Sequence, residues 1–350
     1  VAIGRLALYA QDPASAVEMH NTAVGYKAGA AVTTGIQNTF VGGLAGDAIT
    51  TGSYNSLVGV NAGGATTTGV QNAAFGQGAL SLNTTGSTNT ALGDSSLANS
   101  TTASNNTAVG QAALAANTTG TQNVAVGALA LDANTTANYC TAVGYQSLGA
   151  NTTGTENSAV GRSSLLANTT GGKNVAFGSG TLAGNTTASS NTGLGWAALF
   201  TNTTGANNTA VGSSALVLNT TGANNTAVGS STLYANTTAS DNTAVGIFAL
   251  GVNTTGSENV AVGANALDAN IGGHDNTAVG RMALSANTTG ASNTAFGHQA
   301  LILNTTASNN TAVGKDALSA NTTGYNNTCI GFKAGDLTIT GHHNITIGYL

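Results

Sequence analysis

The chain has 350 residues, of which 49 are glycine, one is proline and only 5% are charged. This composition fits neither an ordinary globular domain nor a charged disordered segment, and it indicates repetitive structure. The formal net charge of −5 comes from seven basic and 12 acidic residues, which leaves no basic stripe to neutralise a nucleic-acid backbone. We therefore expect no nucleic-acid partner.

The chain opens inside a motif, Val1-Ala2-Ile3-Gly4, that recurs later, and it closes at Leu350 part-way through another copy. We therefore expect it to be a fragment of a longer chain. The first interval between recurring glycines is four residues longer than the later ones. Residues 5–24 are thus predicted to form a coil with a four-residue insertion around Asp12 and Pro13, either as a bulge or as a binding loop.

From Gly25 onward a glycine recurs at every seventeenth residue through Gly348, which is the signature of a solenoid. With that glycine as slot 0, the consensus over slots −4 to +12 is Asn-Thr-Ala-Val-Gly-x-x-Ala-Leu-x-x-Asn-Thr-Thr-Gly-x-x, as in residues 106–122. The pattern predicts one short strand on Thr-Ala-Val-Gly and a second near Ala-Leu, separated by turns. The predicted fold is an all-β parallel β-solenoid of about twenty two-stranded coils, with residues 1–350 forming a single shaft.

Three slots carry the structural signal. Slot −1 is always Val, Ile, Leu or Phe, and slot +4 is Leu in every coil from Leu80 to Leu318, so both are predicted to fill the interior. The representative core residues are Val109, Leu114, Val126, Leu131, Val143 and Leu148. Asn recurs at slot −4, where a short amide bonds nearby backbone in turns. It predicts a turn ladder that includes Asn106, Asn123, Asn157 and Asn174.

Two stretches, residues 1–75 and 331–350, contain variant coils in which Gly replaces Leu at slot +4. Phe40 and Leu57 enter the Ala slot −2 there, which predicts a rearranged core that compensates for the lost Leu. The variants are equally compatible with a transition toward another module, with a cap and with simple drift.

A lone coil is predicted to be unstable. Burying one Val and one Leu contributes roughly 1.5–3 kcal/mol each, whereas ordering the backbone costs roughly 1–2 kcal/mol per residue. Hydrogen bonds between coils and association with other chains must offset the deficit. We therefore expect an oligomer.

The repeat Asn-Thr-Ala-Val-Gly followed by Ala-Leu resembles the Asn-Ser-Val-Ala-Ile-Gly head repeats of trimeric autotransporter adhesins. The longer form with Asn-Thr-Thr-Gly is similar to repeats of tail-fibre-like proteins that end in an endosialidase-type chaperone. The resemblance spans essentially the whole chain, and it implies left-handed β-roll coils and a homotrimer. The function expected from it is an extracellular structural shaft, on a cell surface or a virion, that spaces a tip outside this segment toward a glycan or receptor.

Charged residues form two short ladders. Asp241, Glu258 and Asp275 share slot +12 on consecutive coils, and these stacked acids either bind a metal ion such as calcium or line a solvated turn. The basic residues at slot +1 either touch an anionic glycan or are exposed variation; they are Arg281, His298 and Lys315. Ion pairs between neighbouring coils are predicted for two pairs of residues, Glu156 with Lys173 and Asp316 with Lys333.

The two cysteines, Cys140 and Cys329, are about eleven coils apart, which corresponds to roughly 50 Å in a straight rod. Because that distance is far beyond disulfide reach, we expect buried free thiols, or contacts between equivalent thiols of neighbouring chains. Asn-Thr-Thr also matches the acceptor motif for N-glycosylation, and the sequence leaves its use open.

No nucleophile, base and orienting group come together in the repeat, and no loop is built to cradle a phosphate. We therefore expect no enzymatic activity, no catalytic residue and no cofactor. No apolar run approaches the roughly 18 residues of a membrane helix, so we expect no membrane contact by this segment. Two other classes of function stay open, namely ice binding by stacked Thr at slots +8 and +9, and a self-assembling extracellular matrix or adhesive fibre.

Overall fold

The computed structural model describes residues 1–11 and 18–349 and is a parallel β-solenoid of about 20 coils of about 17 residues, with no helix among these residues. The predicted fold class is confirmed at this level. The predicted insertion around Asp12 and Pro13 lies outside the described residues.

Two compact units, Val1–Asn174 and Val175–Leu350, make up the chain, and each is described by itself. The strands of the first unit are β1 (Ala2–Ile3), β2 (Thr22–Val24), β3 (Thr39–Val41), β4 (Ser56–Val58), β5 (Ala73–Phe75), β6 (Thr90–Leu92), β7 (Thr107–Val109), β8 (Val124–Val126), β9 (Thr141–Val143) and β10 (Ser158–Val160). Those of the second unit are β11 (Val175–Phe177), β12 (Thr192–Leu194), β13 (Thr209–Val211), β14 (Thr226–Val228), β15 (Thr243–Val245), β16 (Val260–Val262), β17 (Thr277–Val279), β18 (Thr294–Phe296), β19 (Thr311–Val313), β20 (Thr328–Ile330) and β21 (Ile345–Ile347). A single continuous shaft stays a prediction.

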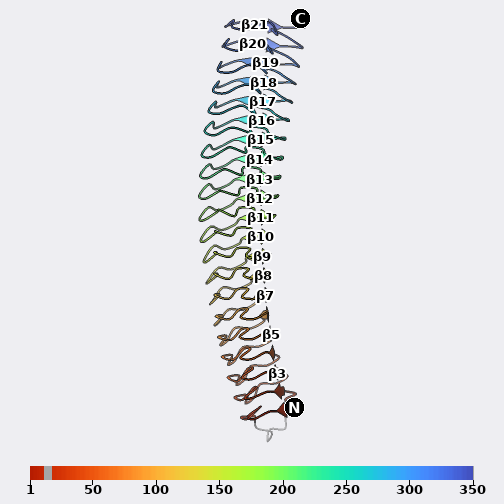
Figure 1. Cartoon of the computed structure of the whole chain (residues 1–350), viewed down its shortest axis with the longest axis vertical. Coiled ribbons are helices and arrows are strands. Elements are labelled where there is room, and N and C mark those ends of the chain that lie inside the picture. Colours follow the sequence, from red (N-terminus) through yellow and green to blue (C-terminus); the bar gives the residue numbers. More distant parts are fainter. Residues whose placement is uncertain (12–17, 350) are drawn as a thin grey trace. The chain divides into compact units, whose positions relative to one another are not determined.

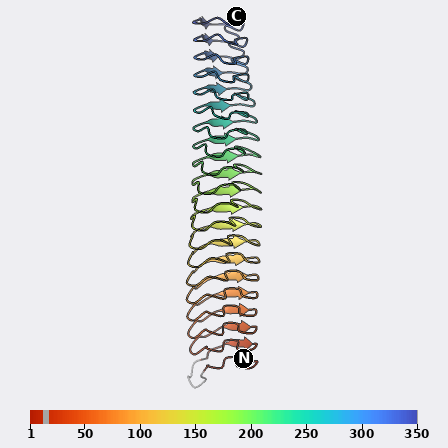
Figure 2. The same cartoon turned by 60° about the vertical axis from the view of Figure 1, so that its left-hand side comes forward.

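Within each unit, successive strands pair in parallel and keep the sequence register. In β7 and β8, for example, Ala108 lies opposite Ala125 and Val109 opposite Val126. Figures 1 and 2 show the strands of each unit stacked in sequence order, with turns linking neighbouring strands. The 17-residue period therefore places every slot directly above the same slot of the coil before it.

Each coil contains one strand, not the two that we predicted. The Ala-Leu segment lies in a turn, because Ala112 and Leu114 adopt left-handed φ angles of 54° and 53° that prevent an extended strand. Equivalent residues do the same along the chain, including Leu131 (52°) and Leu148 (53°). The left-handed backbone costs roughly 1–2 kcal/mol per residue, and burial of the Leu side chain, worth roughly 1.5–3 kcal/mol, offsets it.

The interior of a coil is filled from slots −2, +3 and +4, as in Ala108, Ala113 and Leu114, all fully buried. The predicted leucines of the core are in place: Leu114, Leu131 and Leu148 have no exposed surface. Alanine dominates because the coil encloses little volume beside the leucine column.

The predicted core valines are wrong. Val126 is 37% exposed, and Val109 and Val143 are only half-buried. Side chains alternate across a strand, and the middle residue of each three-residue strand, Ala at slot −2, points inward. Slot −1 must then point outward, on the same side as slot −3.

The Asn ladder at slot −4 is present and lies inside the coil. The backbone N–H of Asn106 donates to Oδ1 of Asn89 (3.0 Å), and Nδ2 of Asn106 donates to the Gly120 carbonyl (2.9 Å). The predicted members of this ladder are all fully buried: Asn106, Asn123, Asn157 and Asn174. Each amide thus joins two coils and satisfies backbone groups that would otherwise be buried without a partner.

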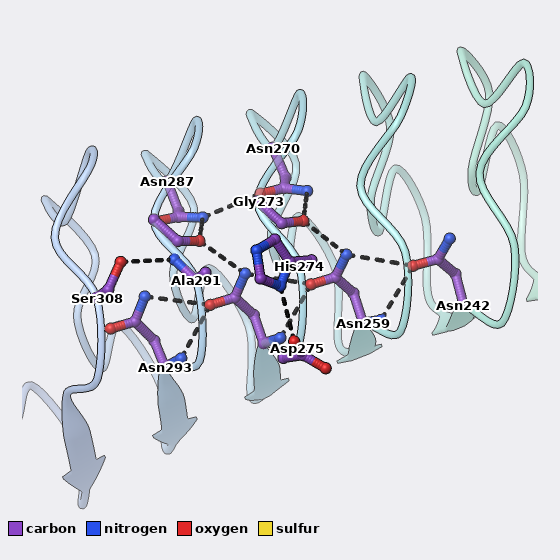
Figure 3. A network of polar contacts seen from close by, with 12 residues as sticks. Asn242, Asn259, Asn270, Gly273, His274, Asp275, Asn287, Ala291, Asn293 and Ser308 are labelled. Atoms are coloured by element: carbon purple, nitrogen blue, oxygen red, sulfur yellow. Dashed lines mark hydrogen bonds and ion pairs between the residues drawn. The ribbon is translucent and has the colours of Figure 1, made fainter.

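A second buried Asn column, at slot +7, converges on the same carbonyls. In the second unit Asn259 and Asn270 both donate to the Gly273 carbonyl, each at 2.9 Å, and Asn259 also takes its place in the first column above Asn242 (Figure 3). Asn287 donates to Oδ1 of Asn270 at 2.9 Å, which extends the second column to the next coil.

The variant coils compensate as predicted. A Cβ added at Gly46 would lie 2.5 Å from the Phe40 ring, and one at Gly63 would lie 2.6 Å from Cδ1 of Leu57. The large side chain at slot −2 therefore occupies the space that Leu fills from slot +4 in other coils. Cys329 and Gly335 repeat this exchange in the second unit, with 2.6 Å between Sγ and the added Cβ.

Candidate functional site

The outward-facing side of the strands, which we call the strand face, is formed by slots −3 and −1. Slot −3 is mostly Thr, and slot −1 is always apolar. The exposed apolar side chains of the strand face are Ile3, Val41, Phe75, Leu92, Val124 and Val126 in the first unit, and Val175, Phe177, Leu194, Val245, Val260, Phe296, Ile330, Ile345 and Ile347 in the second. Apolar strips of this kind mark interaction surfaces.

Two exposed columns border the strand face. Slot +12 precedes the buried Asn at the N-terminal end of each strand and forms the N-edge, whereas slot +1 follows the glycine and forms the C-edge. Both edges carry the charged and aromatic variation of the repeat, as at Glu156 and Tyr139 on the N-edge and Arg162 and Tyr145 on the C-edge. The strand face therefore lies between an N-edge that is mostly polar and a C-edge that mixes polar residues with apolar ones such as Trp196 and Ile247.

Sequence reasoning missed the strand face because it placed slot −1 in the interior. The signal that identifies it is the small residue at slot −2, which is Ala or Gly in every coil from Ala74 to Ala312. Beside a leucine at slot +4, only a small side chain fits at slot −2 of the coil interior. The larger residues on either side of it must then face outward.

The acidic ladder on the N-edge does not assemble a metal site. The residues that the structure describes contain no group of three or more His, Cys, Asp or Glu side chains that could hold a metal ion. Asp241 instead accepts a hydrogen bond from Nδ2 of Asn224 (3.0 Å), and Oδ2 of Asp275 lies 2.7 Å from Nδ1 of His274 (Figure 3). The weak metal candidate formed by Asp241, Glu258 and Asp275 is therefore not supported.

Glu258 and Asp275 occupy slot +12 of neighbouring coils. The Asp275 carboxyl raises the pKa of Glu258, while His274 lowers the pKa of Asp275. Contact with His274 thus offsets part of the repulsion expected between the stacked acids.

On the C-edge of the second unit the basic ladder continues into an aromatic stack. Nζ of Lys315 lies 5.4 Å from the centre of the Phe332 ring, and Phe332 stacks on Tyr349 with centroids 5.5 Å apart. Arg281 is exposed and contacts Met282, and His298 is half-buried. The three basic residues therefore lie in one column, in which Arg281 and Lys315 contact different neighbours.

The two predicted ion pairs between coils are wrong. Within the described part of the chain, no ion pair joins Glu156 to Lys173 or Asp316 to Lys333. Asp316 instead pairs with its neighbour Lys315 at 3.3 Å, and Nζ of Lys333 lies 5.8 Å from the Phe332 ring centre. Long exposed side chains gain little from an ion pair in water, so nearby aromatic contacts compete with it.

The Thr pair at slots +8 and +9 splits between two roles. Oγ1 of Thr118 donates to the carbonyl of Thr135 in the next coil (3.1 Å), and the same bond recurs at Thr135 and Thr152. Thr119, at slot +9, is exposed. Only one hydroxyl column of the pair is therefore free to face solvent.

The Asn residues of the Asn-Thr-Thr motif are closed to modification in the folded chain. Asn117, Asn134 and Asn151 are fully buried. Nδ2 of Asn134, for example, donates to Oδ1 of Asn117 at 2.8 Å. A glycan on these nitrogens would remove the ladder hydrogen bonds and has no room inside the coil.

Both cysteines are buried and free, one in each unit, as predicted for free thiols. Cys140 replaces Asn in the first ladder: its N–H donates to Oδ1 of Asn123 (2.9 Å), and its Sγ donates to the Gly154 carbonyl (3.3 Å). Burial raises the pKa of the Cys140 thiol from 9.0 to about 11 and also raises the pKa of Cys329. Neither thiol is activated as a nucleophile.

The raised pKa of Cys140 makes a prediction for alkaline solution. Above pH 9 the unfolded chain loses this proton while the folded chain keeps it, so stability from this group falls as pH rises from about 9 to about 11. Between pH 8 and pH 11 we expect the wild-type free energy of unfolding to fall by roughly 2 kcal/mol more than that of Cys140→Ser. Urea titrations of both proteins at each pH measure this difference, and parallel pH profiles would contradict it.

A comparison with protein-family models and with curated proteins finds no match for this chain. Over residues 1–11 and 18–349, no helix has the length and hydropathy that a membrane crossing requires.

Proposed function

We propose that this chain is a structural shaft of a homotrimeric extracellular fibre, on a cell surface or a virion. The shaft spaces a receptor-binding tip, which lies outside this segment, from that surface. One observation carries the proposal: slot −1 places an apolar side chain on the strand face in every coil of each unit, half-buried as at Val109 or exposed as at Phe75 and Leu92.

An apolar strip that recurs with every coil has the properties of a lengthwise contact between identical chains. Covering apolar surface stabilises by roughly 25 cal/mol per Å², and every coil of a copy adds the same contribution. This gain is what a single coil lacks, since its interior holds one leucine and several alanines. The resemblance to trimeric fibre repeats favours three copies with their strand faces turned toward a common axis.

Ice binding is the main alternative, because the stacked Thr residues of slot +9, such as Thr119 and Thr136, form a regular exposed column. A free strand face of stacked Thr and Val would be regular as well. Three phenylalanines, Phe75, Phe177 and Phe296, interrupt its slot −1 column and are 41%, 48% and 55% exposed. Rings of this size roughen a surface that ice binding needs to be flat. They are accommodated more readily between chains, where apolar side chains pack around them.

The decisive experiment is the mass of the purified chain by light scattering after size exclusion. One chain has a mass of 33.8 kDa, so the proposal requires about three times that mass. A monomer would overturn the proposal, leave the strand face free and move ice binding or surface adhesion to the front, with thermal hysteresis as the next assay.

Substitution of the strand face separates assembly from folding. We expect Val126→Asp to shift the assembly toward the monomer, because a carboxylate would be buried among apolar side chains at the contact. The same change costs little in a single chain, where Val126 already meets solvent. The matched control is Thr119→Asp, an exposed site away from the strand face, which should keep the wild-type mass. Equal masses for both variants would exclude the strand face as the contact.

A further inference from the structure

Two strands carry opposite charges at their two edges. Glu156 on the N-edge and Arg162 on the C-edge border β10, and Asp275 and Arg281 border β17 in the same slots. All four residues are exposed. Only four strands are preceded by an acidic residue at slot +12. Arg162 and Arg281 each lie at the other end of one of these four strands. Arg5 lies too close to the start of the chain to be compared.

These charges cannot meet within one chain. Five residues, including a complete extended strand, separate the members of each pair, which corresponds to roughly 15–20 Å. No ion pair involves Glu156, Arg162 or Arg281 in the described part of the chain. Each arginine is thus a full charge at the margin of an apolar strip, without a carboxylate within reach.

The geometry of assembly decides which residues do meet. When copies turn their strand faces toward an axis parallel to the coil stack, the N-edge of one copy lies beside the C-edge of the next. Antiparallel copies packed face to face would place like edges together and leave acid against acid. Only a parallel assembly in register therefore brings Glu156 of one copy to Arg162 of another at the same coil.

We propose that Glu156 with Arg162, and Asp275 with Arg281, form ion pairs between parallel copies and fix their register. This inference rests on the proposed homotrimeric shaft and adds its orientation and alignment. From slot +12 to slot +1 the chain climbs about a third of a coil, or roughly 2 Å, which the long arginine side chain spans. Asp241 and Glu258 face Ile247 and Ala264 across their strands and take no part.

A register device is needed because the repeat itself does not specify one. A shift by one coil superposes nearly identical strand faces, with Val or another apolar residue again opposite slot −1. The apolar strip therefore favours association of the copies but does not fix their register along the coil stack. Two unique charge pairs, one in each unit, penalise every shifted alignment by leaving charges unpaired or opposing like charges.

Disulfide trapping tests the register directly. In a background with Cys140→Ser and Cys329→Ala, the variant Glu156→Cys with Arg162→Cys should form covalent oligomers under mild oxidation, because disulfides require Cα atoms within about 7 Å. Intrachain closure is excluded by the length of β10. The offset control, Glu156→Cys with Ala128→Cys, tests an alignment shifted by two coils and should remain uncrosslinked.

The outcomes separate this inference from the proposed function. A trimer by light scattering with cross-links at 156 and 162 supports both. A trimer that cross-links only in the offset control, or in neither variant, overturns the register and leaves the shaft standing. A monomer overturns both proposals.

Charge reversal gives an independent measure. Glu156→Arg alone should weaken trimer assembly about tenfold, since one reversed charge is repeated at three contacts. Adding Arg162→Glu should restore wild-type assembly by exchanging the two charges, and Arg162→Glu alone should again weaken it. Equal loss in the single and double variants would contradict the pairing.

Discussion

Replacement of Gly42 by Ala is expected to open its coil and lower the local free energy of unfolding by about 4 kcal/mol. Gly42 is the slot 0 glycine, with φ of 133°, a region that L side chains rarely adopt. A Cβ there would also lie 2.6 Å from the carbonyl carbon of Gly59 in the next coil. Because that atom belongs to a backbone held by ladder hydrogen bonds, the coils must move apart to admit the methyl group.

The neighbouring glycine supplies a matched control. A Cβ added at Gly43 meets no atom within 4 Å, and its φ is not in the left-handed region. Gly43→Ala should therefore be neutral or stabilise by about 0.4–1 kcal/mol. Amide exchange of the coil around 38–54, read by mass spectrometry, measures both variants. Similar protection in the two would show that close stacking of the slot 0 glycines is not what holds neighbouring coils together.

This glycine column is also the feature that sequence reasoning could predict best. An invariant residue at a fixed 17-residue spacing, with Leu and Asn at constant offsets, establishes a solenoid, a leucine column and an amide ladder without any coordinates. Each follows from one rule, that equivalent slots stack. The contacts between equivalent residues of successive coils can therefore be predicted from the sequence.

Whether a side chain points into the coil or toward its surface cannot be predicted in the same way. A three-residue strand such as Thr107–Val109 offers too short an alternation to tell inside from outside. Val has the higher apolarity, so hydropathy places it in the core, whereas the narrow coil admits only the methyl group of Ala108. The interior volume of the coil decides which side chain is buried, and that volume depends on a cross-section that the sequence does not specify.

The missing second strand has a different origin. Leu114 has no preference for a left-handed backbone, and Ala-Leu next to a strand pattern reads as extended. The fold imposes φ of 53° because this turn directs the leucine inward, where its burial exceeds the conformational cost. Local propensity is thus overridden by packing that only the stacked coils provide.

Exchanging core residues within one variant coil should convert it to the common type. Leu57→Ala alone removes a fully buried side chain and is expected to cost about 2–5 kcal/mol. Gly63→Leu alone should cost at least about 3 kcal/mol, because its Cβ would lie 2.6 Å from Cδ1 of Leu57. Leu57→Ala is thus destabilised by a cavity, and Gly63→Leu is destabilised by overpacking.

The double variant should recover to within about 1 kcal/mol of the wild type, since Ala at slot −2 with Leu at slot +4 is the arrangement of most other coils. Backbone geometry permits it: φ is 59° at Gly63 and 57° at Leu80, the leucine of the next coil. A double-mutant cycle from urea unfolding gives the coupling energy, expected to be about 4 kcal/mol or more in favour of the pair. Additive losses would mean that the side chains at slots −2 and +4 do not occupy the same volume of the core. The variant coils would then be a separate packing type, not an exchange of one large side chain between these two slots.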